Sequence, residues 1–265
     1  GKDGTILCHK AITVPYFDLS RYDMPEFYRF HTANGEGEYV DENIVERPTG
    51  LHLYLYLLER YFIGLPEEQC CKGAYPRDAL ASFKLGEDVC YMDETPAYTA
   101  DTLAALKITG SPTSLYMANF WGHDENLMYY RNHCYPYMSP GWGSTSDYIL
   151  LSNGDTWDVA MYSNWSFWSS GGAFTCFDKD EYTVRPGTEL TVSSKAYGTT
   201  FEGSDFYDFT NLDVFIYNSK WEQVGDQVKA ADDGKATFTV TAPTEEGTYY
   251  IVGMDPNRKI ATDDS

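Results

Sequence analysis

The sequence predicts a mainly β protein of two domains, in which an α+β domain with one packed helix is followed by a β-sandwich. Three observations lead to this prediction. Short runs rich in aromatic and β-branched residues recur along the chain, separated by glycine, proline and asparagine. One longer apolar run, residues 51–63, is flanked by helix start and stop signals. A length of 265 residues also exceeds that of a typical single domain.

The first elements of the chain are a predicted strand and the helix. Residues 5–18 hold an apolar, β-branched run that ends near Pro15 and predicts a first strand. The run LHLYLYLLERYFI fits both an alternating strand and one face of a helix. Pro48-Thr49 before it and Gly64 with Pro66 after it are helix boundary signals. The segment is also long for a strand, so we expect a buried helix.

Two stretches near this helix favour irregular structure. Asn34-Gly35-Glu36-Gly37 predicts a turn or exposed loop. Residues 66–112 carry repeated glycine and proline turn signals and no strong period, which indicates a long insertion with a short helix at residues 101–106.

A β-hairpin is predicted at the end of the first domain. Ser152-Asn153-Gly154-Asp155 lies between two apolar runs, and Asn-Gly suits the positive φ angles of a type I′ turn. The predicted arms are residues 148–151 and 156–162. In the second arm, Trp157, Val159 and Met161 alternate with Thr156, Asp158 and Ala160, so one face should meet a core.

A composition break separates the two predicted domains. Ser169-Ser170-Gly171-Gly172 follows Trp168 and is typical of a linker. We expect the first domain at residues 1–170 and the second at residues 173–265.

Short strands at regular spacing predict the β-sandwich of the second domain. Phe238, Val240 and Ala242 should face its core, while the threonines between them face outward. The predicted strands are residues 181–184, 189–193, 212–217, 235–242 and 248–253.

One motif in this region resembles immunoglobulin-like domains. Glu246-Gly247-Thr248-Tyr249 is similar to their tyrosine corner, which implies a bond from the Tyr249 hydroxyl to upstream backbone. Ile251 stands where antibody domains have cysteine. The residues after Pro256 are poor in strand formers, so the sandwich is expected to lack a well-formed last strand, either because that strand is degenerate or because the chain continues.

Three motifs of the first domain resemble a known extracellular family. They are Tyr129-Tyr130-Arg131-Asn132-His133, Gly141-Trp142-Gly143-Ser144 and Leu151-Ser152-Asn153-Gly154-Asp155. Their order resembles the family of the C-terminal β domain of transcobalamin and intrinsic factor, over residues 11–162. The resemblance implies a β-grasp-like fold and a role in recognition. The helical barrel that completes the corrinoid site of those relatives has no counterpart here.

The combination of both domains is similar to surface proteins of Gram-positive gut bacteria, in which such a domain precedes immunoglobulin-like modules. This resemblance implies an extracellular or cell-wall-attached protein.

The charge excludes some partners. With 19 basic and 40 acidic residues, the formal net charge is −21. Such a chain repels nucleic acid and anionic membranes, so neither is an expected partner. No apolar run is long enough to span a bilayer, and we expect no membrane insertion.

The sequence predicts no metal and no cofactor. Six cysteines without a C-x-x-C pair argue against a zinc site, and most should be free thiols. If one disulfide forms, it should join Cys70 or Cys71 to Cys90. The acidic pairs Asp178/Asp180 and Asp232/Asp233 could hold calcium at a loop between the domains, but they lack the spacing of an EF-hand, so no calcium site is expected.

Catalytic patterns are weak, so we expect a non-enzymatic protein. His123-Asp124-Glu125 and His133-Cys134 are neighbours in sequence, and neighbouring side chains in a strand point to opposite faces. The alternatives are a hydrolase that uses Cys134 or a carboxylate pair, and a structural spacer in a larger surface protein.

Aromatic residues provide the candidate site. The central stretch holds more rings than one small sheet can bury, and about half should pack the helix onto the sheet. We expect Trp121, Tyr137 and Trp142 to flank a shallow groove, with Tyr129 and Tyr130 as further ligand contacts. The ligand would be a glycan, a corrinoid-like planar molecule, or a host or bacterial protein. The full aromatic set is Trp121, Tyr129, Tyr130, Tyr135, Tyr137, Trp142, Trp165 and Trp168.

Overall fold

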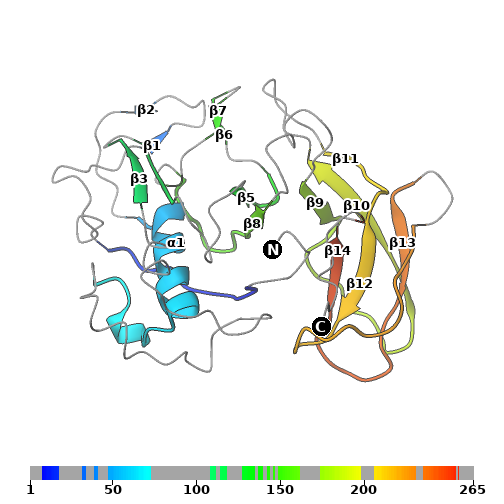
Figure 1. Cartoon of the computed structure of the whole chain (residues 1–265). Coiled ribbons are helices and arrows are strands. Elements are labelled where there is room, and N and C mark those ends of the chain that lie inside the picture. The colour runs from blue at the N-terminus through cyan, green and yellow to red at the C-terminus, as the bar shows by residue number, and fades with distance from the viewer. Residues whose placement is uncertain are drawn as a thin grey trace, which may run out of the picture. The chain divides into compact units, whose positions relative to one another are not determined.

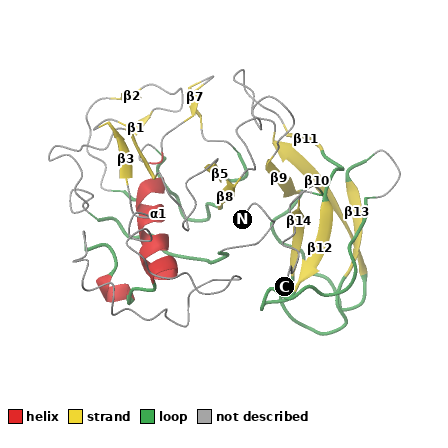
Figure 2. Cartoon of the chain, in the orientation of Figure 1, coloured by secondary structure: helices red, strands yellow, loops and turns green. Residues whose placement is uncertain are grey.

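The computed structural model is mostly β, with antiparallel sheets and one short α-helix (Figure 1). Its described residues form two compact units, residues 8–161 and residues 174–256. Figure 2 shows that the described part of the second unit consists of strands and loops. The residues that the structure describes are 8–17, 32–33, 39–40, 47–72, 108–111, 114–117, 127–134, 137–139, 142–143, 146, 149–161, 174–197, 206–230, 235–254 and 256.

The helix of the first unit is buried on all sides, as expected for a segment that is apolar around its whole circumference. Helix α1 spans Gly50–Leu57, and the π-helical stretch η2 continues it over Leu58–Ile63. Gly64 ends it at a φ of 81°, a left-handed conformation that suits glycine. A short 3-10 helix, η3, follows at Glu67–Gln69. The predicted helix is confirmed.

The described strands of the first unit form antiparallel pairs. They are β1 (Thr32–Ala33) with β2 (Tyr39–Val40), β3 (Ile108–Ser111) with β4 (Ser114–Met117), β5 (Leu127–Arg131) with β8 (Trp157–Met161), and β6 (Tyr137–Ser139) with β7 (Trp142–Gly143). Strand β3 lies at the end of the stretch predicted to be irregular. The turn at residues 34–37 and the short helix at residues 101–106 lie outside the described residues.

The predicted first strand is wrong over residues 8–17, where the chain forms no β-ladder. This segment packs against α1 instead. Phe17 is buried, its ring lies 4.6 Å from that of His52, and its carbonyl oxygen is 2.9 Å from His52 Nε2. Burial against the helix thus replaces strand pairing as the stabilising interaction.

The predicted hairpin is also wrong, although its turn exists. Asp155 N–H donates to the Ser152 carbonyl at 3.1 Å, and Gly154 has a φ of 86°. Asn153 does not have positive φ, so the turn is not type I′. Its two arms pair elsewhere. Leu150 bridges to Thr49 at the start of α1, and β8 pairs with β5.

Two sheets share one core in the second unit (Figure 1). Strand β10 (Glu189–Tyr197) pairs with β9 (Phe174–Phe177), β11 (Phe206–Asp208) and β13 (Thr237–Thr241), while β12 (Asp213–Tyr217) pairs with β14 (Tyr250–Met254). The buried side chains of this core come from β10, β12 and β13: Val192, Val214, Ile216, Phe238 and Val240.

Most predicted strands of this unit are confirmed within two residues at each end, apart from β10, which extends further. The inward and outward alternation along β13 is confirmed as well, with Phe238 and Val240 buried and Thr239 exposed. The strand predicted at residues 181–184 does not form. Strands β9 and β11 were not predicted.

A carboxylate extends the ladder between β9 and β10 beyond its last strand residue. Asp178 N–H donates to the Ser193 carbonyl at 2.9 Å, and Asp178 Oδ1 accepts the Ser193 N–H at 2.7 Å. The Tyr182 hydroxyl donates to the same oxygen at 2.7 Å. Burial raises the pKa of Asp178, but these hydrogen bonds outweigh it and hold the pKa below its usual value.

Tyr249 makes the bond that its motif implies. Its hydroxyl donates to the Glu245 carbonyl at 3.2 Å. The ring lies partly buried against the core between the sheets. The predicted contact is therefore confirmed.

Candidate functional site

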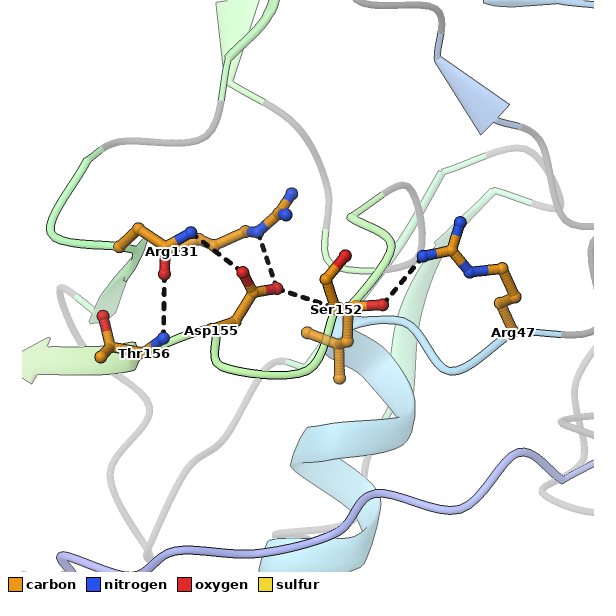
Figure 3. Close-up of polar contacts among 7 residues, drawn as sticks. Arg47, Arg131, Ser152, Asp155 and Thr156 are labelled. Carbon is orange, nitrogen blue, oxygen red and sulfur yellow. Dashed lines mark hydrogen bonds and ion pairs between the residues drawn. The ribbon is translucent and has the colours of Figure 1, made fainter.

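The end of β5 and the turn at residues 151–156 are joined by a polar network (Figure 3). Asp155 lies at its centre. Its Oδ2 accepts from Arg131 Nε at 2.9 Å and from Ser152 N–H at 2.8 Å, and its Oδ1 accepts from Asn132 Nδ2 at 2.9 Å. Two of the three family-like motifs therefore meet at this carboxylate.

Asn132 bonds the backbone of Thr156, the residue that precedes β8. Its Oδ1 accepts from Thr156 N–H at 2.9 Å, and its backbone N–H donates to the Thr156 carbonyl at 3.0 Å. Both termini of the Asn132 amide are thus occupied. The side chain fixes where β8 begins relative to β5.

A type I′ turn forms here and not at Asn153. Asn132 and His133 have φ angles of 52° and 62°, and Arg131 and Cys134 exchange two backbone hydrogen bonds at 3.0 Å. Asparagine accepts left-handed conformations more readily than most residues, and histidine is also enriched at positive φ.

Asp155 is ionised at neutral pH. Partial burial raises its pKa, but hydrogen bonds from Asn132, Ser152 and Arg131 lower it further, so the pKa lies below the usual value. The carboxylate therefore accepts three donors as an anion.

A second arginine contacts the same turn. Arg47 Nη2 donates to the Leu151 carbonyl at 3.1 Å. Leu151 O and Ser152 N belong to the same peptide group. The N–H of this group donates to Asp155, and Asp155 also accepts from Arg131, so the two arginines are linked through one peptide group and one carboxylate. Figure 3 shows Arg47 and Arg131 on either side of Ser152.

Two of the predicted ligand contacts pack within the first unit. Tyr129 stacks on Trp157 at 5.5 Å with an interplanar angle of 10°, and both rings meet Tyr54 of α1 edge-on at 5.9 Å. Tyr130, on the other face of β5, is 1 % exposed. The rings of Tyr129 and Trp157 hold the β5–β8 pair against the helix, and packing is the role expected for about half of the aromatic set.

Tyr137 and Trp142 lie on the neighbouring strands β6 and β7. Tyr137 is opposite Gly143 and Ser139 is opposite Trp142, with an irregularity in register between them. Strands β6 and β7 thus form a short hairpin. Trp121, Tyr135, Trp165 and Trp168 lie outside the described residues.

Cys134 does not have the character of an activated nucleophile. Its side chain is half-buried, and burial raises its pKa, whereas catalytic thiols have lowered pKa values. The adjacent His133 contacts a different group, since its Nδ1 lies 3.0 Å from Asp158 Oδ2. His123-Asp124-Glu125 lies outside the described residues.

A buried histidine occupies the start of α1. Thr49 N–H donates to His52 Nδ1 at 3.1 Å, so Nδ1 is an acceptor and Nε2 carries the proton donated to the Phe17 carbonyl. Burial lowers the pKa of His52 to about 4. This neutral ring takes the place of the usual glutamate or glutamine of a capping box.

The described residues hold no group of three or more potential metal ligands. Asp178 of the acidic pair is committed to Ser193 and Tyr182, while Asp232 and Asp233 lie outside the described residues. Among the described helices, none is long and apolar enough to cross a bilayer.

Cys70 is a thiol and not half of a disulfide. Its Sγ lies 3.5 Å from the Pro66 carbonyl, and burial, followed by the charge of Glu59, raises its pKa to about 12. Cys90, the partner proposed from the sequence, lies outside the described residues.

Sequence reasoning did not assign roles to Arg47 or Arg131. A lone arginine carries little information in a sequence, because its partner is defined only by the fold. The signal that could have found Arg131 is its position in the Tyr129–His133 motif, next to Asn132.

Comparisons with known protein families, with curated proteins and with solved structures found no match.

Proposed function

We propose that the protein is a non-enzymatic, extracellular or cell-wall-attached binding or adhesion protein. It would pair a transcobalamin-like β-grasp domain with an immunoglobulin-like sandwich. The contact between Asn132 and Asp155 supports the first resemblance, because it unites two of the motifs that carry it. The bond from Tyr249 to Glu245, in a core shared by two sheets, supports the second.

The β6–β7 hairpin carries the proposal of a ligand site. It brings the backbones of Tyr137 and Trp142 onto two paired strands, so both aromatic residues belong to one local structural unit. Large amphipathic rings on a hairpin are suited to stack on sugars or planar molecules and to anchor protein partners. The proposed ligand is a glycan, a corrinoid-like molecule or a host or bacterial protein.

A hydrolase is less well supported. The half-buried thiol of Cys134, whose pKa is raised by burial, opposes nucleophilic catalysis by this residue.

A binding screen tests the proposal. The full chain would be applied to a glycan array and titrated with cyanocobalamin and cobinamide, and Trp142→Ala would be compared with the unchanged protein. We expect at least one ligand whose binding Trp142→Ala abolishes, while the midpoint of thermal unfolding changes little, as for a surface substitution.

Tyr207→Ala provides the matched control, because Tyr207 is an exposed aromatic residue of the other unit. It should leave binding unchanged. Loss of several kcal/mol of stability in Trp142→Ala, as for a core aromatic, would assign Trp142 to packing and reject the site. Absence of any ligand would favour the structural spacer.

A further inference from the structure

Two arginines are concentrated on one turn of a strongly acidic protein. Arg47 and Arg131 are two of the four arginines among the described residues, and both contact the turn at residues 151–155. The formal net charge of the chain is −21. A local pair of cations on such a surface needs a reason beyond solubility, which the acidic residues already provide.

Arg131 is held in place through its Nε atom. Only Nε contacts Asp155, and Asp155 has its remaining acceptor oxygen bonded to Asn132. The side chain is 34 % exposed. Within the described residues, the terminal nitrogens of Arg131 therefore have no carboxylate to bind, although their fork geometry matches a carboxylate or sulfate.

Arg47 is held on the opposite edge of the same peptide group. One terminal nitrogen donates to Leu151 O, and the side chain is exposed, so among the described residues its other donors remain available to a ligand. The two guanidinium groups lie at most about 11 Å apart. This limit follows from three contacts and the width of the Leu151–Ser152 peptide group; the contacts are Arg47 to Leu151, Ser152 to Asp155, and Asp155 to Arg131.

Ser152 lies between the two arginines (Figure 3), so a ligand that contacts both has to extend across the turn. An extended chain that carries repeated negative groups suits this arrangement. Between the two arginines, the turn presents exposed Ser152 and Asn153, and the space around Gly154 is open. Hydroxyl and amide groups of this kind donate to and accept from sugar hydroxyls.

We propose that Arg47, Arg131 and the turn at residues 151–155 form a binding site for a carbohydrate chain that carries carboxylate groups. This site is separate from the aromatic hairpin and does not depend on the proposed function of that hairpin. Long-range repulsion from the acidic surface is screened beyond about 8 Å at physiological ionic strength, so contacts at the arginines can still form.

The test uses the full chain and two probes with the same backbone. One probe is an oligogalacturonate, with a carboxylate on each sugar, and the other is its fully methyl-esterified form, which lacks the charges. We expect binding of the acid and none of the ester. Arg47→Gln should weaken binding by about tenfold, as loss of one charged hydrogen bond does. Arg131→Lys, which keeps the charge but loses the fork, should weaken it to a similar extent.

Arg185→Gln is the control, because Arg185 is an exposed arginine of the other unit. It should bind as the unchanged protein does. Arg47→Gln removes only an exposed side chain, so it decides the result if Arg131→Lys unfolds. No binding of oligogalacturonate, equal binding of the ester, or binding that is insensitive to Arg47→Gln would overturn the proposal. Tighter, Arg47-dependent binding of a hexaglutamate peptide would overturn the assignment to carbohydrate.

Discussion

The side-chain amide of Asn132 donates to the carboxylate of Asp155 at 2.9 Å and thereby joins two motifs that lie 23 residues apart in sequence. The oxygen of the same side-chain amide accepts a hydrogen bond from the backbone N–H of Thr156. Asn132 therefore couples the type I′ turn after β5 to the residue that precedes β8. The β5–β8 pair is fixed in register at this end by side chains as well as by its ladder.

Asp155→Asn should destabilise the first unit by about 1–3 kcal/mol. The change leaves Arg131 without its carboxylate partner. The new side chain has one acceptor oxygen in place of two, and its amide group can meet the donor amide of Asn132, so hydrogen bonds are lost. Urea unfolding measures the loss. Asp226→Asn, at an exposed site of the other unit, should change the free energy of unfolding by less than about 0.5 kcal/mol. Equal effects of the two substitutions would contradict the role of the network.

Gly154→Val should cost about 1–3 kcal/mol of stability. No atom lies within 4 Å of an added Cβ, so the cost comes from a β-branched residue at a φ of 86°. Gly154→Asn should cost clearly less, because asparagine tolerates the left-handed region. Thermal unfolding of both variants separates backbone strain from crowding. A valine variant as stable as the asparagine variant would show that φ at this position is not constrained.

Gly50→Ala should destabilise the protein although alanine is the better helix former. An added Cβ would lie 2.5 Å from Cη2 of Trp157 and 3.0 Å from the Ser146 carbonyl. Overpacking of this kind costs about 1–3 kcal/mol.

A double-mutant cycle tests the cause of that loss. Trp157→Phe removes the outer ring of the indole, so Gly50→Ala should be less costly in that background than in the unchanged protein. Additive effects would mean that the indole and residue 50 do not compete for the same space.

Acidification should weaken the first unit through His52. Its pKa is lowered to about 4 in the folded protein, from 6.5 for an unperturbed histidine. The stabilisation is therefore complete above pH 6.5. It is lost as the pH falls from 6.5 to 4, because the unfolded chain binds a proton that the folded chain does not. The loss should reach about 3 kcal/mol.

His52→Gln isolates this contribution. Glutamine can serve in a capping box and does not titrate in this range. Its free energy of unfolding should change less between pH 6.5 and pH 4 than that of the unchanged protein. Parallel pH profiles for the two proteins would exclude His52 as the source.

The features that the sequence predicted correctly were of two kinds. Some had boundary residues or an alternating pattern within the segment itself, and others depended on a hydrogen bond between residues close in sequence. The boundary residues Thr49 and Gly64 identified α1 despite the competing strand period. Phe238 and Val240 face the core as their alternation indicates. The Tyr249 contact was predictable because its partner, Glu245, lies only four residues away.

The errors arose where long-range partners decide the structure. Asn153-Gly154 has the local chemistry of a hairpin turn, but Thr49 and β5 take the two arms. Strand β9 has little pattern of its own and is defined by pairing with the end of β10. The contacts of Arg47 and Arg131 with the turn depend on the same tertiary arrangement, so no sequence window contains them.

The carboxylate of Asp178 affects how two molecules of this protein can associate through a strand edge. Beyond the end of β9, none of the described strands pairs with this edge of β10, so its backbone donors could pair with an incoming strand. Asp178 already occupies the first of these donors, the N–H of Ser193, and places a negative charge beside the next positions. A second copy that approached this edge would have to displace a charged acceptor with its own neutral carbonyl. We therefore expect this side chain to disfavour edge-to-edge aggregation at high protein concentration.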